Sequence, residues 1–414
     1  MYIIPGYIRY KEENGVLFVS SDLLHNVIKL TDTALQAEFC ELIKSGGCAD
    51  LSTPLTQFLH AQELLLTKAE IDQSLETVKA LMDDVLMLTI MPTEGCNFRC
   101  PYCYEDHTPH HMTRKLLDRL KDFIQEQAPK FKVVRVNWFG GEPTLCQDNV
   151  LEIAYLIQSL QSVHQFYYSS SMTTNGYLLD RKHFDQLYAS GIKCFHITLD
   201  GWNHDHTRPH VSGAGTLQHI LDNLISISEL PQNEYDFKVI IRHNILAGDM
   251  DFSWYDHLYH LFGKDPRFSL TVRTVNDWGG ESVMNLDLVQ GEKKISLPQL
   301  HEEYLDKIGM KRECENSEMF ARICYAAYPN GYVFRANGEI VKCSVALDHP
   351  RNLVGHLDPQ NGVSVDSVAN QLWYQNELRP ECYTCPDVLS CFNMQCKRYA
   401  VIDNQEPYCH RTDF

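Results

Sequence analysis

The sequence has no apolar run near the ~20 residues that a membrane-spanning helix requires, and it has no low-complexity tract. Its amino terminus lacks a basic segment followed by a long apolar one, so we expect no export signal and a reducing, cytoplasmic location. Lysine and arginine number 36 against 54 aspartates and glutamates, and they form no cluster. The net charge of -18 therefore argues against nucleic acid as a partner, because phosphate binding depends on grouped cations.

The length of 414 residues suggests roughly two to three domains, and residues 1–84 read as a small module of their own. Asn14-Gly15 separates two β-prone runs, and both residues tolerate the positive φ of a tight hairpin turn. Thr67 and Glu70 form a capping-box pattern before a helical stretch. A hairpin with about three helices predicts a winged-helix-like module.

Residues 85–309 alternate between apolar runs and amphipathic stretches. We expect strands at 85–91, 133–139, 166–174, 193–200, 237–246 and 268–275, and helices at 114–127, 147–161, 180–189, 216–228 and 252–262. Repeated βα units favour a parallel sheet with its site at the carboxyl ends of the strands. The predicted fold class is therefore α/β, with a partial (β/α)6 TIM-like barrel.

Residues 310–414 hold eight of the fifteen cysteines and show little regular helix. Asn337-Gly338 marks another hairpin turn. Since we expect a reducing compartment, metal is a better explanation than disulfides for so many thiols. We therefore predict a separate cysteine-rich, metal-stapled domain in this part of the chain.

Three more cysteines, Cys96, Cys100 and Cys103, lie within eight residues directly after the first strand of the predicted barrel. A zinc site is one interpretation, although structural zinc usually takes four ligands in two pairs. A [4Fe-4S] cluster is the other, because three thiolates leave one of its four irons open to a small molecule.

The spacing Cys96-x3-Cys100-x2-Cys103, with Tyr102 before the third cysteine, resembles the cluster-binding signature of radical S-adenosylmethionine (SAM) enzymes. The resemblance implies that the open iron binds the amino and carboxylate groups of SAM. It also implies that an electron from the reduced cluster cleaves SAM to a 5'-deoxyadenosyl radical, so that the cofactor supplies the difficult chemistry.

Motifs at later strand ends extend the resemblance. "FGGEPTL" resembles the family motif that contacts the methionine amino group, and its glycines permit a close approach of the backbone. "TTNG" and "ITLDG" resemble the strand ends that contact ribose and carboxylate, and a nearby arginine could bind a carboxylate bidentately. The implied SAM-binding residues are Tyr102, Gly140, Gly141, Glu142, Pro143, Thr174, Asn175, Asp200 and Arg208. No catalytic base can be named.

The carboxyl-terminal cysteines resemble the seven-cysteine auxiliary-cluster section known as SPASM. The resemblance implies two auxiliary [4Fe-4S] clusters, one bound by Cys324, Cys343 and Cys396 and the other by Cys382, Cys385, Cys391 and Cys409. The first set is one ligand short, so Cys314 closes it or the position stays open for a substrate. The spacing between Cys391 and Cys396 departs from the family pattern, and zinc remains an alternative for 382–409.

The remaining cysteines, Cys40, Cys48, Cys146 and Cys194, lie in apparently helical or strand contexts, and we expect them to be small buried hydrophobic residues.

The resemblance spans about residues 85–410 and implies modification of a peptide or protein. We expect a maturase that binds a ribosomally made precursor peptide through its leader, with 1–84 as the recognition module or, alternatively, a structural cap. It would install a thioether or carbon-carbon crosslink, using electrons from a donor such as flavodoxin or ferredoxin. One alternative is a formylglycine-forming sulfatase maturase, although those relatives have an acidic residue where this chain has Ser344. The other is a non-catalytic iron-sulfur or zinc protein that binds peptides.

Overall fold

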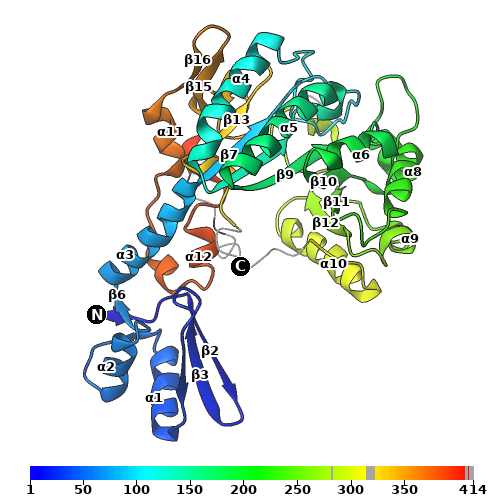
Figure 1. Cartoon of the computed structure of the whole chain (residues 1–414). Coiled ribbons are helices and arrows are strands. Elements are labelled where there is room, and N and C mark those ends of the chain that lie inside the picture. The colour runs from blue at the N-terminus through cyan, green and yellow to red at the C-terminus, as the bar shows by residue number, and fades with distance from the viewer. Residues whose placement is uncertain (281–282, 314–321, 406–408, 410–414) are drawn as a thin grey trace. The chain divides into compact units, whose positions relative to one another are not determined.

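The computed structural model describes residues 1–280, 283–313, 322–405 and 409 (Figure 1). These residues form two compact units. The first unit takes 1–84, 322–329, 371–405 and Cys409, and the second takes 85–313 and 330–370. The proposed three-domain division at 84/85 and 309/310 stays a prediction. No helix among the described residues has the length and apolar character needed to cross a membrane.

The amino-terminal part of the first unit contains the hairpin and the three helices that the sequence predicts. Strands β2 (Ile8–Glu13), β3 (Val16–Ser21) and β4 (Val27–Leu30) form an antiparallel sheet in that order. The turn between β2 and β3 has positive φ at Asn14 and Gly15, as expected. Helices α1 (Thr33–Lys44), α2 (Pro54–Ala61) and α3 (Lys68–Lys79) follow.

Helix α3 begins with the predicted capping box. The Thr67 hydroxyl accepts from the Glu70 amide at 3.3 Å, and the Glu70 carboxylate accepts from the Thr67 amide at 2.7 Å. Three two-residue strands were too short to predict from the sequence: β1 (Tyr2–Ile3), β5 (Cys48–Ala49) and β6 (Leu66–Thr67), which pair in the order β5-β1-β6. The carboxyl-terminal part of this unit adds the short helices α12 (Val388–Cys391) and α13 (Lys397–Val401).

The second unit is built on a sheet whose ten strands lie in the order β12-β11-β10-β9-β8-β7-β13-β14-β15-β16. The six predicted strands are β7 (Val85–Ile90), β8 (Val133–Trp138), β9 (Tyr167–Thr174), β10 (Ile192–Thr198), β11 (Lys238–Ile245) and β12 (Phe268–Thr274). They are parallel to one another, which confirms the α/β partial barrel, and the sheet does not close.

The other four strands are β13 (Gly331–Phe334), β14 (Glu339–Val341), β15 (Leu353–Asp358) and β16 (Gly362–Val365). The predicted Asn337-Gly338 hairpin joins β13 to β14, and β13 pairs in parallel with β7. The sequence did not predict that this hairpin would extend the barrel sheet, because strand order depends on contacts between distant segments.

Crossover helices follow the parallel strands, as Figure 1 shows along the cyan-to-yellow part of the chain. They are α4 (Arg114–Gln127), α5 (Gln147–His164), α6 (Arg181–Ala189), α8 (Leu217–Ser228), α9 (Ser253–Phe262) and α10 (Lys293–Ile308). Each predicted helix is present. In α4 the buried side chains recur at helical spacing, at Leu116, Leu120 and Ile124, which explains why this stretch forms a helix with one apolar side.

The two faces of the parallel sheet differ in polarity. In β8, Val134, Val136 and Trp138 are buried, whereas Arg135 and Asn137 between them remain partly accessible. Because side chains alternate along a strand, the accessible residues share one face, which we call the open face. The open face carries Asn137, Ser171, His196, Arg242 and Arg273, among others.

Candidate cofactor site

The loop after β7 carries Cys96, Cys100 and Cys103 and is held by backbone hydrogen bonds to a segment that follows β10. The Arg99 amide donates to the Pro209 carbonyl, and the Val211 amide donates to the Asn97 carbonyl, both at 2.9 Å. We call this loop, residues 91–113, the cysteine loop. Its position at the carboxyl end of the parallel sheet is the one that the sequence predicts.

The glycines of "FGGEPTL" allow the end of β8 to touch the cysteine loop. Gly140 has φ +113°, and a Cβ there would lie 2.2 Å from the Thr93 carbonyl oxygen. A Cβ on Gly141 would lie 2.3 Å from the Gly95 carbonyl oxygen. The sequence predicts a close approach to a ligand at these glycines. The close approach seen here is to the cysteine loop, and contact with SAM stays a prediction.

Glu142 joins the ends of β8 and β9. Its buried carboxylate accepts from the Thr174 hydroxyl and the Asn175 amide, both at 2.7 Å, and from the Thr144 amide at 3.0 Å. Burial raises the pKa of Glu142, while these hydrogen bonds oppose that effect. Pro143, also buried, starts the 3-10 turn that follows. The predicted site residues Glu142, Pro143 and Thr174 therefore lie together in the interior.

Asn175 connects the end of β9 to the cysteine loop. Its side-chain amide donates to the Asn97 side-chain carbonyl at 2.7 Å, and it lies 4.0 Å from the Cys96 sulfur. The predicted residue Asn175 is thus a direct neighbour of a predicted cluster ligand.

Tyr102, Asp200 and Arg208 form a second polar group beside the cysteine loop. The Tyr102 hydroxyl donates to the Asp200 carboxylate and accepts from the Arg208 guanidinium at 2.9 Å. Burial raises the pKa of Tyr102 well above its usual value, so the phenol stays neutral. Burial lowers the pKa of Arg208, but the neighbouring Cys100, Tyr102 and Asp200 outweigh it and hold the pKa above the ordinary range.

One donor of this group has no partner. The Arg208 Nε–H is buried and makes no hydrogen bond. An unsatisfied buried donor beside the cysteine loop fits a site that receives an anionic group, such as the carboxylate of SAM.

The three thiols of the cysteine loop are buried enough to resist ionisation on their own. Burial raises the pKa of Cys96 to about 12 and that of Cys103 to about 12, and it also raises the pKa of Cys100. Metal ligation requires thiolates, so a cation must offset this effect. Among the described residues, no three Cys, His, Asp or Glu side chains converge as a single metal ion requires. A cubane does not need such convergence, because each thiolate binds a different iron.

Most of the predicted auxiliary ligands lie in the first unit. Burial raises the pKa of Cys391 to about 11, and the proximity of Cys382 and Cys385 adds to this effect. Burial lowers the pKa of Arg379, but Cys409 and then Cys382 outweigh it and raise the pKa, so Cys409 belongs to the same neighbourhood. Cys382 and Cys385 thus lie near Cys391, and Cys409 and Cys382 lie near Arg379, but no three of these four described thiols converge as a single metal ion requires.

The cysteines proposed for the first auxiliary cluster belong to different units: Cys324 and Cys396 to the first and Cys343 to the second. Lys397 directly follows Cys396. Burial lowers the pKa of Lys397, and the negative charge of the Cys324 thiolate would oppose that effect, so Cys324 lies near Lys397. Cys343 belongs to the second unit, after β14. Cys314 lies outside the described residues.

The expectation that the four remaining cysteines are buried is wrong. Cys40 and Cys48 are exposed, while Cys146 and Cys194 are partly exposed. Cys40 lies on α1, whose buried side chains are Phe39 and Leu42, and its own side chain is exposed. Cys146 lies 3.2 Å from His111 Nδ1, and Cys194 lies 3.7 Å from His196 Nε2.

Two acids beside the cysteines, buried Glu94 and half-buried Glu105, were not predicted from the sequence. Glu94, at the start of the cysteine loop, pairs with Arg335, which directly follows β13. Burial raises the pKa of Glu105 to about 8, with a further contribution from Glu94, and its Oε2 has no hydrogen-bond partner. No local pattern marks either acid, because their environment depends on a residue far along the chain.

Comparison with known proteins finds a family match for part of the chain. Residues 90–251 match the family model of the radical SAM superfamily. GTP 3',8-cyclase of Haemophilus ducreyi is 30% identical over 176 residues, which is 41% of this chain and 49% of that protein. GTP 3',8-cyclase of Aquifex aeolicus is 27% identical over 311 residues, 71% of this chain and 90% of that protein. The chain thus spans about half the length of the first of these relatives and most of the second.

Solved structures share the fold. The structure of anSMEcpe with bound AdoMet and Cp18Cys peptide aligns with a TM-score of 0.55 and 17% identity, covering 78% of this chain and 92% of that one. Streptococcus suis SuiB bound to precursor peptide SuiA aligns with a TM-score of 0.50 and 14% identity, covering 99% of this chain and 98% of that one. At these identities the alignments establish the fold alone. The radical SAM match itself is limited to residues 90–251.

Proposed function

We propose that this protein is a radical SAM maturase that installs an oxidative crosslink, a thioether or a carbon-carbon bond, in a ribosomally made precursor peptide. Cys96, Cys100 and Cys103 would hold the SAM-binding [4Fe-4S] cluster, and Arg208 would bind the SAM carboxylate. When bound, the cluster and SAM supply a 5'-deoxyadenosyl radical that removes a hydrogen atom from the peptide. The cysteines of the carboxyl-terminal section would hold two auxiliary clusters, one of which would take up the second electron of the crosslinking oxidation while the second hydrogen leaves as a proton to solvent.

The observation that carries this proposal is the contact between the amino-terminal module and the auxiliary-cysteine segment within the first unit. The Gly6 amide donates to the Tyr383 carbonyl at 2.8 Å, and Arg9 donates to the Pro386 carbonyl at 2.7 Å. A Cβ on Gly6 would lie 1.9 Å from the Cys385 carbonyl oxygen. A mere cap over a barrel would not need such contacts with the cysteine-rich segment, whereas a peptide-gripping module must be held beside the site that it serves.

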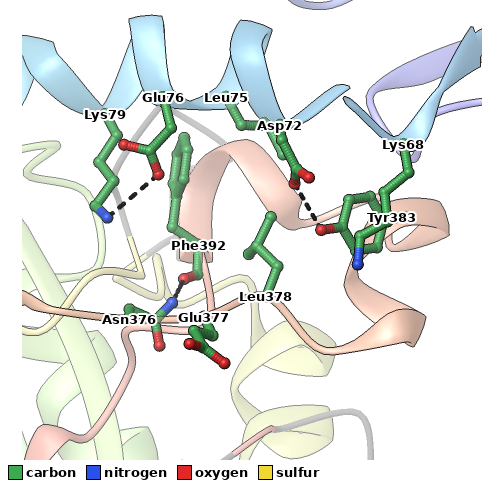
Figure 2. A pocket seen from close by; sticks show the side chains of 10 residues that line it. All are labelled: Lys68, Asp72, Leu75, Glu76, Lys79, Asn376, Glu377, Leu378, Tyr383 and Phe392. Carbon is green, nitrogen blue, oxygen red and sulfur yellow. Dashed lines mark hydrogen bonds and ion pairs between the residues drawn. The ribbon is translucent and has the colours of Figure 1, made fainter. Parts of the chain in front are cut away.

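A pocket in the same unit supports a peptide partner. It has a volume of about 270 Å³ and lies between α3 and the segment 376–392 (Figure 2). Leu75, Tyr383 and Phe392 supply buried apolar surface, while Glu76 and Glu377 are exposed. Such a mixture suits an apolar peptide side chain flanked by polar groups.

The charges of the amino-terminal module and of the pocket indicate which residues the leader peptide should carry. Residues 1–84 contain thirteen acidic and six basic residues. In the pocket, Lys79 already lies 3.5 Å from Glu76, and Lys68 lies over the Tyr383 ring at 4.8 Å (Figure 2). Glu377 has no ion-pair partner among the described residues, so the pocket favours a leader with a basic residue beside an apolar one.

The sequence similarity to GTP 3',8-cyclases supports a second candidate, a nucleotide cyclase. It accounts less well for the amino-terminal module, because a small-molecule substrate needs no leader-binding unit. A formylglycine-forming sulfatase maturase and a non-catalytic iron-sulfur or zinc protein remain the other candidates, the former supported by the fold shared with anSMEcpe.

The test is anaerobic incubation of the reconstituted protein with dithionite and SAM, with either GTP or any short peptide whose reading frame lies beside the gene. We expect 5'-deoxyadenosine to form and the peptide to lose two hydrogen atoms by mass spectrometry. Conversion of GTP with an unchanged peptide mass would favour the cyclase. Absence of 5'-deoxyadenosine from protein with intact clusters would favour the non-catalytic reading.

Deletion of residues 1–84 is a poor test of leader binding, since it would expose the segment around Cys385. Point variants test leader binding without exposing that segment. Glu377→Lys should weaken peptide binding about tenfold, as the loss of one favourable charge contact would. Glu41→Lys, an equal charge change on α1 away from the pocket, is the matched control. Equal peptide affinity in both variants would remove the pocket from the proposal.

A further inference from the structure

Two arginines lie on the open face of adjacent strands of the sheet. Arg242 is on β11 and Arg273 is on β12, and the register pairs Arg242 with Thr271 and Asn244 with Arg273. Arg273 is two residues beyond the partner of Arg242, so the two arginines are diagonal neighbours on the same face of adjacent parallel strands. Both side chains keep accessible surface, although protein atoms crowd around Arg242, and both lie in the carboxyl-terminal half of their strands.

Neither arginine pairs with a carboxylate in the described part of the chain. Arg242 Nε donates to the Asn244 side-chain carbonyl at 2.7 Å, and Arg273 Nη1 donates to the Val272 carbonyl at 3.0 Å. A guanidinium has five N–H donors, so most donors of each remain for another partner. Burial lowers the pKa of Arg242, and the nearby positive charge of Arg273 lowers it further. Two unneutralised cations in a chain of net charge -18 are an unusual arrangement.

The nearby acids that the structure describes form no ion pair with the two arginines, although the charge of Asp200 partly opposes the lowering of the Arg242 pKa. The Asp200 carboxylate already accepts from Tyr102, from the Thr207 hydroxyl and from the Asn244 amide. Glu313 also reaches this part of the molecule, where it raises the pKa of Cys194 and opposes the effect of burial on the pKa of His196. Neither acid forms an ion pair with the two arginines.

The arginine pair is linked to the cofactor site. Asn244, which accepts from Arg242, donates through its side-chain amide to the Tyr102 hydroxyl at 3.4 Å. Tyr102 precedes Cys103 in the cysteine loop. An anion held by the two arginines would therefore be fixed relative to that loop by a short chain of hydrogen bonds.

We propose that Arg242 and Arg273 bind a carboxylate of the substrate peptide, from an acidic side chain or the chain terminus, and so position it on the open face beside the cofactor site. Two guanidiniums can each offer a parallel pair of N–H donors to the oxygens of such a group. This inference rests on the proposed function. A phosphate would satisfy the same donors, and GTP is the phosphate source that the sequence relatives suggest.

Arginine modification by phenylglyoxal tests the proposal on the holoenzyme without any substitution. The probes are the peptide Ac-Gly-Glu-Gly-NH2, its glutamine counterpart and GTP, and the readout is the modification rate of each arginine by peptide mass mapping. We expect the glutamyl peptide, at roughly nine times its Kd, to slow modification of Arg242 and Arg273 about tenfold, and the glutamine peptide at the same concentration to have no effect. Arg135, exposed on the open face at β8, is the internal control and should react at the same rate throughout.

The outcomes separate this inference from the proposed function. Equal protection by the glutamine peptide, or none by any probe, would overturn the anion site even if the protein crosslinks its peptide. Protection by GTP at about tenfold lower concentration than the glutamyl peptide would replace the peptide carboxylate with a nucleotide phosphate. Formation of 5'-deoxyadenosine and the mass of the natural peptide are measured separately, so failure of the maturase proposal is read from those assays.

Discussion

Arg335 Nε donates to Glu94 Oε1 at 2.8 Å, and both side chains are almost fully buried. The same guanidinium reaches Glu339 at 2.6 Å and Asp348 at 2.8 Å. Glu94 stands two residues before Cys96, and Arg335 follows β13 directly. The hairpin that precedes Cys343 is therefore joined to the cysteine loop by a charged network.

Removing one partner of this network should damage the cysteine loop. Arg335→Met leaves the Glu94 carboxylate buried without its cation, which costs about 3 to 5 kcal/mol in unfolding free energy. Urea unfolding measures the loss, and iron content shows whether the cluster ligands remain organised. Arg181→Gln, which breaks the exposed Arg181–Asp185 pair, is the control and should cost below about 1 kcal/mol. Equal losses in the two variants would contradict a role for Arg335 in holding the loop.

Gly140 should not tolerate a side chain. Its φ of +113° is strained for other residues, and the added Cβ would lie 2.2 Å from the Thr93 carbonyl oxygen. We expect Gly140→Ala to lower the unfolding free energy by more than about 2 kcal/mol and to reduce cluster retention. Gly248→Ala, where a Cβ meets open space, is the matched control. A Gly140→Ala protein with wild-type stability and iron content would show that the contact can relax.

His204 should make stability depend on pH. Burial lowers the pKa of His204 to about 4, with a further contribution from Arg208, whereas an unfolded histidine titrates near 6.5. The unfolded chain therefore binds more protons between these values, so stability falls as the pH drops from about 6.5 towards 4, by roughly 2 kcal/mol. Unfolding free energies measured from pH 7 to pH 4.5 test this.

The control for this titration is His204→Asn. Asparagine keeps an acceptor for the Asp200 amide, which donates to His204 Nδ1 at 3.1 Å, but it cannot titrate. The variant should show a shallower fall in stability over the same pH range. Identical pH profiles for the two proteins would mean that another group is responsible.

Cys100→Ala should remove one cluster and leave the others. We expect iron to fall by about four atoms per chain and SAM cleavage to stop, because each cubane holds four irons. Cys385→Ala should instead lower iron while spontaneous SAM cleavage persists. Exposed Cys40→Ala is the control with unchanged iron. Loss of zinc rather than iron and sulfide in Cys100→Ala would contradict the cluster assignment.

Local patterns were enough for most of the secondary structure. The turn at Asn14-Gly15, the capping box at Thr67 and the six alternating strands depend on residues close together in the chain, so their physical basis is visible in the sequence. The spacing of Cys96, Cys100 and Cys103 is equally local, and the cluster that it predicts lies within the segment that matches the radical SAM family.

Only the tertiary structure decided which distant residues meet. Glu94 and Arg335 are 241 positions apart, and no periodicity links them. Nor does any local pattern place Arg242 beside Arg273, direct β13 to the edge of β7, or divide the carboxyl-terminal cysteines between two units. Strand order and register determine these contacts, and both arise from the packing of the whole sheet rather than from the preference of any one segment.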